Sequence, residues 1–507
     1  MKNIPLFIFI LILYSAFVSA QEVPDWVENK GLSKWYSEDS YLTGFGISSY
    51  TKNDKLSSIN QIAEENAKKN LSEKILVQVK SLTRSLKEQD GYYFTQKLES
   101  EVISISEIEL LGLKREFYTD HKKNLVYCLV YVPKSYLIKS YDFKAFEKTN
   151  ELESLYYAAR EYEKNGQKDK ALESYLNCYP LISNINDFQN VLLGLGKLPE
   201  NEVVIDKADL VHSINKLVTT INSLNDLAFF IAYVFQEQTR DEILSGVIVS
   251  PLTYRNTGMS SMFSKQFKES VEHHLITHNK WETYPIKKYD PTIENMNTIK
   301  YAVKGSYWDT EDKITINIYV SEILTGIKKA SIEYQFDRSL IDEDYTPIQP
   351  DNFLLAKGDM DIFNNKEIKT NGLFLNVYTN KGQEDLIFYE GEKMKIYLKV
   401  NMPCYIRLIY HLNDSSRILL LNNEFIAADQ VNKIYELPFT FICREPFGVE
   451  TLQVNARESR FPDIKQYEKN GMVYIDESLP DIIENVRGND KYIMQAEKRL
   501  TITTMPN

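Results

Sequence analysis

The sequence predicts a multi-domain α+β protein: an α+β N-terminal domain, a helical hairpin, an α/β middle domain and a C-terminal antiparallel β-sandwich or barrel-like domain. Its 507 residues are too many for one ordinary hydrophobic core. Hydrophobic residues make up 43% of the chain and charged residues 26%, which is typical of globular proteins. Segments of helical and of strand periodicity alternate along the chain, and a polar stretch precedes the last β-rich region.

These changes of pattern divide the chain into parts. The predicted parts are a signal peptide at 1–20, an α+β domain at 21–147, a tetratricopeptide-like hairpin region at 148–221, an α/β domain at 222–345, a linker at 346–367 and a β-rich domain at 368–507. Pro347 and Pro350, which follow a run of acids at 342–344, indicate the linker.

The first residues have the pattern of a secretory signal peptide. Lys2 is followed by an apolar run over residues 5–18, and Ala20 is the small residue expected before cleavage between Ala20 and Gln21. A spanning helix needs about 20 apolar residues, so a membrane anchor is less favoured. A lipid anchor needs cysteine as the first mature residue, and Gln21 takes that place. We therefore expect an exported, periplasmic protein, either free or held at the outer membrane through protein contacts.

Charge and cysteine usage narrow the class of partner and cofactor. The net charge of −12 argues against nucleic acid and anionic membrane surfaces, because both bind basic faces. No later stretch approaches membrane-spanning length, so no transmembrane segment is expected in the mature chain. The cysteines at 128, 178, 404 and 443 lack zinc-type spacing. Cys128 is expected to be a buried free thiol, while a disulfide between Cys404 and Cys443 stays an open alternative.

The N-terminal domain is predicted from one helix and several strands. A strand over 41–49 precedes a helix whose apolar residues recur at helical spacing: Ile59, Ile62, Ala63, Ala67, Leu71 and Ile75. The segment ILVQVKS at 75–81 alternates as a strand does, and a last strand covers 125–132 after a turn at 122–124.

Part of this domain has a recognisable residue order. Trp26 lies in P-D-W, Gly44 and Gly46 lie in Y-L-T-G-F-G, and Ala63 and Ala67 lie in the helix that follows. The order resembles the LPP-twenty-type outer-membrane lipoprotein domain and the N-terminal domain of the flagellar assembly protein T. The resemblance implies an envelope protein, although the lipidation cysteine of the lipoproteins is missing.

The next region resembles a tetratricopeptide helix hairpin. Its residues at the offsets of that repeat are Leu155, Ala159, Tyr162, Gly166, Ala171 and Tyr175. One repeat cannot bury its apolar face alone, and residues 181–200 show no clear second copy. We therefore expect a solitary hairpin that packs on a neighbouring domain, or an unrelated hairpin of the same shape.

The middle domain is predicted to mix helices and strands. An apolar helix at 224–238 precedes a strand at 245–252. A second helix carries apolar residues at i,i+4 spacing: Phe263, Phe267, Val271 and Leu275. Two alternating strands, at 314–320 and 330–336, flank a turn at Thr325-Gly326. The layout of residues 301–336 resembles envelope assembly domains, namely the TolB N-terminal domain, the flagellar outer-membrane protein O and the curli-export CsgG group.

The C-terminal region reads as a series of strands, two of them joined by an Asn413-Asp414 turn. The order of its residues resembles a bacterial C-terminal domain of unknown function found in exported or kinase-linked proteins. The residues that carry this resemblance are Tyr389, Gly391 and Glu392, the segment 405–410, Leu420, Asn422, Pro446, Gly448 and Glu450.

Few residues have a spacing that indicates chemistry. His274 and His278 are four apart and are candidate metal ligands on one helix face, but a third ligand is missing and the same residues suit a helix C-terminus. Gly44 and Gly46 have the place of a phosphate loop without its full pattern, and a strand-to-helix turn is the favoured interpretation. No catalytic residue, no cofactor-binding residue and no cofactor is predicted.

The leading hypothesis is therefore a non-enzymatic scaffold or accessory protein of a secretion- or motility-type envelope assembly, with envelope proteins as partners. One alternative is a glycan- or peptidoglycan-binding module that uses aromatic residues of the C-terminal domain, such as Tyr405, Tyr410 and Tyr435. Another alternative is an enzyme of unknown class.

Overall fold

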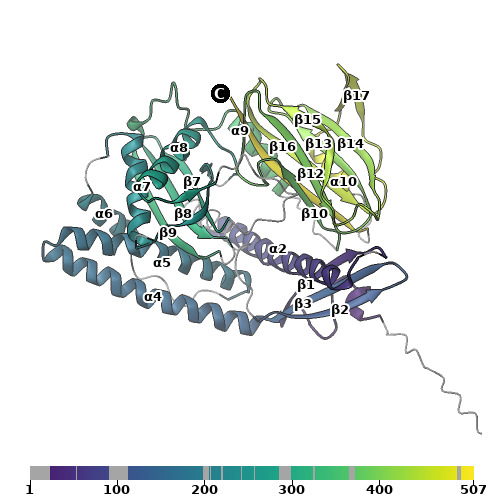
Figure 1. Ribbon diagram of the computed structural model, residues 1–507, viewed down its shortest axis with the longest axis horizontal. Helices are drawn as coiled ribbons and strands as arrows, with labels where there is room; N and C mark the ends of the chain where they lie inside the picture. The colour runs from purple at the N-terminus through teal and green to yellow at the C-terminus, as the bar shows by residue number, and fades with distance from the viewer. Residues whose placement is uncertain are drawn as a thin grey trace, which may run out of the picture.

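The computed structural model (Figure 1) describes the chain between residues 23 and 506, except for residues 53, 91–111, 198–204, 206, 219–220, 241, 256, 285–298, 324–325, 365–371 and 488–492. For residues 76–90, 207–208, 364 and 487 only the backbone is described. The expected signal peptide, with Ala20 and Gln21, lies outside the described residues. Within the described part, no helix is both long enough and apolar enough to span a bilayer.

The N-terminal unit is a three-stranded antiparallel sheet under a long helix. Its elements are α1 (Asp25–Glu28), β1 (Tyr41–Ser49), α2 (Leu56–Asp90), β2 (Lys114–Asp120) and β3 (Leu125–Pro133). The strand order is β1-β3-β2. Alternate residues of β3, Val126, Cys128 and Val130, are buried beneath α2, as strand periodicity requires.

The predicted strand at 75–81 is wrong, because those residues continue α2. The buried residues of α2 are spaced by four and include Leu71 and Ile75, so the helical stripe extends into the supposed strand. The alternation of apolar and polar residues after Ile75 is also compatible with a helix. Helix α2 therefore overrides the local strand signal.

The expected helical hairpin is present, formed by α4 (Lys134–Lys164) and α5 (Lys168–Gly194), and α4 begins inside the region 21–147. Gly166 takes φ +71° in the turn between them, a backbone conformation that glycine adopts without steric cost. Ala159 packs with Ala171 and Tyr175 in one buried cluster. The short helix α6 (Lys207–Leu217) adds a further contact to α5.

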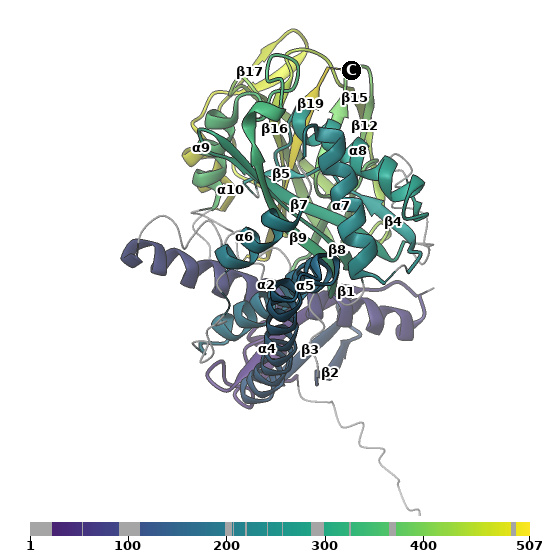
Figure 2. The ribbon, with the colours of Figure 1, turned by 90° about the vertical axis from the view of Figure 1, so that its left-hand side faces the viewer.

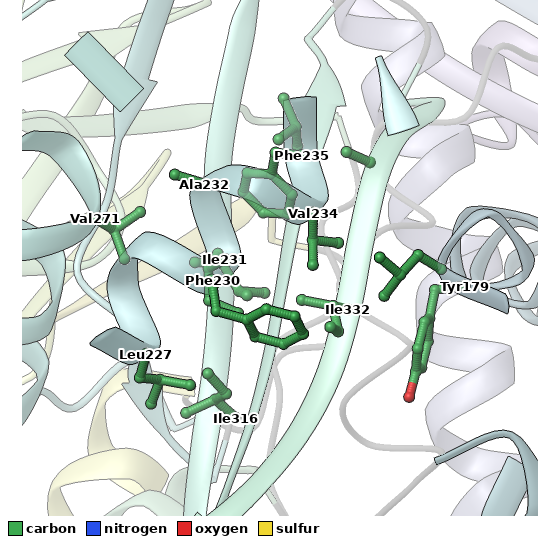
Figure 3. Close-up of a cluster of buried hydrophobic side chains, with 14 of the residues drawn as sticks. Tyr179, Leu227, Phe230, Ile231, Ala232, Val234, Phe235, Val271, Ile316 and Ile332 are labelled. Atoms are coloured by element: carbon green, nitrogen blue, oxygen red, sulfur yellow. The ribbon is translucent and has the colours of Figure 1, made fainter. Parts of the chain in front are cut away.

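The middle unit has a mixed sheet with helices packed on it. Its elements are α7 (Leu224–Gln238), β4 (Ser245–Val249), β5 (Thr253–Tyr254), α8 (Met262–Thr277), β6 (Glu282–Thr283), β7 (Tyr301–Asp309), β8 (Lys313–Glu322) and β9 (Lys328–Asp337). The strand order is β6-β4-β7-β8-β9, with β5 beside β7, which confirms the expected α/β pattern. Figure 3 shows Phe230 and Ile231 of α7 packed toward Ile316 and Ile332 of the sheet, with Tyr179 of α5 on the other side of β9.

A short helix interrupts the predicted linker. The 3-10 turn Arg338–Leu340 follows β9, and α9 (Phe353–Asn364) lies within the region 346–367. Phe363 of α9 joins a small buried cluster with Leu479 and Ile483. This segment therefore packs on the C-terminal unit instead of remaining solvated along its length.

The C-terminal unit is a sandwich of two sheets. One sheet has the order β10-β12-β15 and the other β11-β19-β16-β13-β14-β18-β17. Their bounds are β10 (Leu375–Thr379), β11 (Leu386–Tyr389), β12 (Lys393–Val400), β13 (Cys404–His411), β14 (Arg417–Ile426), β15 (Tyr435–Ile442), β16 (Gly448–Arg457), β17 (Gln466–Lys469), β18 (Met472–Ile475) and β19 (Gln495–Met505). Helix α10 (Leu479–Arg487) precedes β19.

This arrangement confirms the sandwich and not the barrel among the described strands, with one difference. Strands β11 and β19 pair in parallel, so the unit is not purely antiparallel. Cys404 and Cys443 are buried in the core between the sheets as free thiols. Cys128 is likewise free and buried, as the sequence predicts. The Asn413-Asp414 turn joins β13 to β14.

Candidate functional site

One cleft of the described chain lies where three units meet. Its lining comes from α5, from the strands β5, β7, β8 and β9 of the middle sheet, and from the loop between β10 and β11. The cleft encloses about 70 Å³. Figure 2 shows α5 beneath the middle sheet, and Ser183 and Asn186 of α5 line the cleft.

A buried ion pair stands at the α5 side of the cleft. Lys328 Nζ lies 3.1 Å from Asp187 Oδ2, and each side chain is only 5% exposed. The ammonium also donates to Ser183 Oγ at 2.7 Å and lies 4.8 Å from the centre of the Tyr319 ring. A buried charge needs such partners, because removing one member of a buried pair leaves the other without compensation.

Side-chain amides close the edge of the middle sheet next to this pair. Strand β9 is an edge strand, so part of its backbone has no neighbouring strand to bond. Asn184 bonds both the N–H and the C=O of Lys328, each at 3.3 Å. Gln238 of α7 accepts from Ser331 N at 2.8 Å and donates to Ser331 O at 2.9 Å. The helices α5 and α7 therefore satisfy and cover the edge that would otherwise pair with another chain.

A second ion pair crosses the mouth of the cleft. Lys304 Nζ of β7 lies 3.1 Å from Glu384 Oε2 in the β10–β11 loop. The positive charge of Lys304 lowers the pKa of the Glu384 carboxyl. This pair joins the middle unit to the C-terminal unit.

The lining of the cleft is mainly polar and charged. The Ser331 hydroxyl is buried, and its Oγ makes no hydrogen bond within the structure. Glu333 and Asp385 add carboxylates and Lys304 adds an ammonium to the lining. The described lining holds no histidine and no cysteine. The cleft offers donors and acceptors for a small polar molecule or for ordered water.

The sequence did not indicate these residues, because they are far apart in the chain. Lys328 and Asp187 are separated by 141 residues, and Lys304 and Glu384 by 80. Each is an ordinary surface-type residue in its own segment. Only a prediction that β9 is an edge strand facing α5 would have brought them together.

The two candidate metal ligands lie side by side at the C-terminal end of α8. The rings of His274 and His278 stack with centres 5.2 Å apart, and His274 Nε2 lies 3.0 Å from Asn225 Oδ1. Burial, aided by His278 and His273, lowers the pKa of His274. Across the described residues, no group of three His, Cys, Asp or Glu could hold a metal ion. His278 is the C-cap of α8, in agreement with the alternative interpretation.

Gly44 and Gly46 lie inside β1, so the expected strand-to-helix turn at these residues is wrong. A Cβ atom on Gly44 would lie 2.1 Å from Ala67 O, and one on Gly46 would lie 2.1 Å from Ala63 O. The two glycines let α2 rest directly on the strand. Their role is close packing, and Ala63 and Ala67 serve the same contact from the helix.

The tyrosines proposed for glycan binding have different environments. Tyr410 is buried in the sandwich core, where its hydroxyl donates to Glu450 Oε2 at 2.6 Å. Tyr405 packs against Phe425 with ring centres 4.9 Å apart. Tyr435 is partly buried against the core between the sheets. Tyr410 therefore cannot present its ring to a glycan in this structure.

The chain has few detectable similarities to known proteins. No protein-family model matches the sequence, and no curated protein is similar to it. One solved structure that is similar is the secreted protein HP1454 from Helicobacter pylori, at 10% sequence identity. The match covers 62% of this chain and 96% of that chain, with a TM-score of 0.20. The score is too low to assign a shared fold.

Proposed function

We propose that the protein is an exported, non-enzymatic scaffold or accessory protein of a bacterial envelope assembly, of the secretion or motility type. The observation that carries this proposal is the contact cycle, in which each of the four units touches two others: N-terminal to hairpin, hairpin to middle, middle to C-terminal, and C-terminal to N-terminal. A chain whose units hold one another in this way presents several surfaces at fixed positions, which is what a scaffold requires.

The C-terminal to N-terminal contact closes the cycle. Asn401 Nδ2 donates to Ile47 O at 2.6 Å, and Ser49 N donates to Asn401 O at 3.1 Å. Asn432 Nδ2 reaches Ser48 Oγ at 2.8 Å. These amides bond the backbone of β1, and Asn401 is itself buried. Buried amides with satisfied partners fix the relative position of two units more specifically than apolar contact does.

The other three contacts combine apolar and polar groups. Val191 and Leu192 of α5 belong to the same buried cluster as Leu71 of α2. The hairpin and the middle sheet share one continuous core. Ser260 N, in the middle unit just before α8, donates to Thr503 Oγ1 of β19 at 3.0 Å.

The N-terminal unit also offers a surface for a protein partner. Trp35 is 81% exposed and Leu32 is 53% exposed, in the loop between α1 and β1. Exposed aromatic side chains of this size are enriched where proteins bind one another. The resemblance of this domain to envelope lipoprotein and flagellar assembly domains supports the same assignment.

In-cell photo-crosslinking tests the proposal. A photoreactive residue replaces Trp35 in the full chain, and a matched variant carries it at Lys122, an exposed polar position of the same unit. We expect large adducts with envelope proteins from position 35 and far fewer from position 122. Free chain in the soluble periplasm, with no adduct at either position, would contradict the scaffold. Retention on purified cell wall without protein adducts would favour the glycan-binding alternative.

A further inference from the structure

Helix α4 has one face that is mostly exposed in the described chain, although Tyr136 near its start lies against Gly112. Its inner face packs on α5 and the N-terminal unit through buried residues that include Tyr141, Leu152 and Ala159. The opposite face carries large side chains that are half exposed or more: Tyr136 at 50%, Phe143 at 60%, Phe146 at 53% and Tyr157 at 59%. Figures 1 and 2 both place α4 on the outside of the molecule, with α5 between it and the middle sheet.

These four aromatic residues form a stripe along the helix. At 100° per residue they fall within an arc of about 80°. Elsewhere in the described chain no single helix or strand has more than two large exposed apolar side chains. A concentration of this kind on one helix face is typical of an interaction surface, whereas scattered exposed residues are ordinary.

The charges of α4 indicate which partner fits the stripe. The N-terminal half, residues 134–148, has four lysines against Asp142 and Glu147, a net charge of 4 − 2 = +2. The C-terminal half, residues 149–164, has four glutamates against Arg160 and Lys164, a net charge of 2 − 4 = −2. An antiparallel copy of the same helix places each basic half against an acidic half.

We propose that two copies of this chain associate through the aromatic stripe of α4, with the two helices antiparallel. The aromatic residues of one copy face those of the other when a two-fold axis passes between Phe146 and Glu147. Tyr136 then lies opposite Tyr157 of the second copy, and Phe146 lies next to Phe146 of the second copy at the axis. Such an interface is isologous, since the same patch serves both subunits.

The charge pattern also disfavours the parallel arrangement. A parallel pair would place Lys139 beside Lys139 of the second copy and acidic half against acidic half. In the antiparallel pair Lys139 lies about one turn from Glu151 of the second copy, within reach of an ion pair. The two helix dipoles also oppose each other in that arrangement. This inference goes beyond the scaffold function and does not depend on it.

Sedimentation of the mature chain tests the pairing. We expect a dimer that dissociates on dilution, and a double variant Phe143→Ser, Phe146→Ser whose dissociation constant is raised roughly tenfold or more, because central aromatic residues dominate such interfaces. The matched control is the double variant Tyr345→Ser, Phe425→Ser, which removes two exposed aromatic residues outside α4. Far-UV circular dichroism checks that each variant is folded.

Disulfide trapping tests the orientation, since the native cysteines are all buried. The variant Phe143→Cys, Asn150→Cys should cross-link between copies on mild oxidation, whereas either single variant should not. A chain that is monomeric at the highest concentrations overturns the proposal. A dimer that persists in the Phe143→Ser, Phe146→Ser variant, or that cross-links through Phe143→Cys alone, overturns it as well. These outcomes do not depend on any envelope partner.

Discussion

At the scale of single residues, Glu450 is the clearest case of a side chain whose properties the fold has changed. It sits at the end of the sandwich core, where it accepts the hydrogen bond of Tyr410 at 2.6 Å. Burial raises the pKa of its carboxyl to about 7. In the unfolded chain a glutamate has a pKa near 4.3, so the folded protein holds a proton at pH values where the unfolded chain has lost it.

This difference predicts a pH dependence of stability. Because the folded pKa is raised, the contribution of Glu450 is complete below about pH 4.5 and is lost as pH rises to about 7, by about 3 kcal/mol. The variant Glu450→Gln cannot titrate, so its stability relative to the parent should increase over that window. Urea unfolding of both proteins between pH 4.5 and 8 measures the difference. Glu424→Gln, at an exposed residue, should show no such trend.

Gly46 lets the backbone of α2 pack directly against β1. Its Cα faces α2 so closely that a Cβ would lie 2.1 Å from Ala63 O and 2.5 Å from Ala67 N. We expect Gly46→Ala to destabilise the N-terminal unit by about 2–3 kcal/mol, because the helix must move away from the strand. Gly358→Ala is the control, since a Cβ there meets nothing within 4 Å and alanine favours the helix. Equal unfolding midpoints for the two variants would contradict this role.

At the scale of secondary-structure elements, the edge strand β9 shows how a sheet is ended inside a larger molecule. The sheet stops at β9, and α5 supplies Asn184 and Asp187 where another strand would lie. Helix α7 supplies Gln238 to the same strand. The hairpin is therefore a structural part of the middle unit as well as a connector.

The buried pair between β9 and α5 should show strong coupling. We expect Lys328→Met or Asp187→Leu alone to destabilise the protein by about 3 kcal/mol, because each leaves a buried charge. The double variant should lose less than the sum of the two, with a coupling of at least about 1 kcal/mol. A double-mutant cycle by chemical denaturation measures this coupling. If the two losses of stability are additive, Lys328 and Asp187 are not energetically coupled.

Helix α2 shows the limit of local patterns at the same scale. The residues ILVQVKS alternate like a strand, yet Ile75 sits in register with Leu71 on the helical stripe that covers β1 and β3. A short apolar run fits both the helical and the strand periodicity. Which of the two forms depends on which of its faces packs against the rest of the protein. The hairpin was predictable because its turn glycine and its alanines act locally.

At the scale of the whole molecule, the contact cycle makes each junction depend on the others. Asn401 holds the closing junction through bonds to Ile47 O, Gly372 O and Phe374 N. All of these bonds involve a side chain that is buried. Loss of this amide should therefore weaken the contact of the C-terminal unit with β1, where the bonds from Asn432 remain, without unfolding either unit.

Asn401→Ala tests this junction. The substitution removes the partner of Gly372 O and of Phe374 N within the C-terminal unit and one donor to Ile47 O, which keeps its bond from Asn66 Nδ2, and the loss should be about 2–3 kcal/mol. We expect faster amide exchange in β1, and separate unfolding transitions for the N-terminal and C-terminal units in calorimetry. Asn177→Ala is the control, since Asn177 is partly exposed on α5 and its side chain donates to the carbonyl of Glu173 in its own helix. A single unfolding transition with an unchanged midpoint in Asn401→Ala would show that residues other than Asn401 hold the C-terminal unit against β1.

The sequence by itself determined the class of fold and the local elements, because periodicity, turn residues and burial patterns act over a few residues. It identified the hairpin through Gly166 and Ala171, the middle helices through Phe263 and its neighbours, and the strands of the sandwich. Those features follow from the chemistry of each segment alone.

Only the tertiary structure decided which segments face one another. The cleft joins residues of α5, β7, β9 and the β10–β11 loop, and Lys328 meets Asp187 only because α5 lies against the edge of the sheet. The sequence pattern of α5 does not indicate that it contacts β9, and the pattern of β9 does not indicate that it contacts α5. Pairings between distant segments depend on the shape and burial of the whole chain, and the same holds for the exposed face of α4, which is defined by what α5 leaves uncovered.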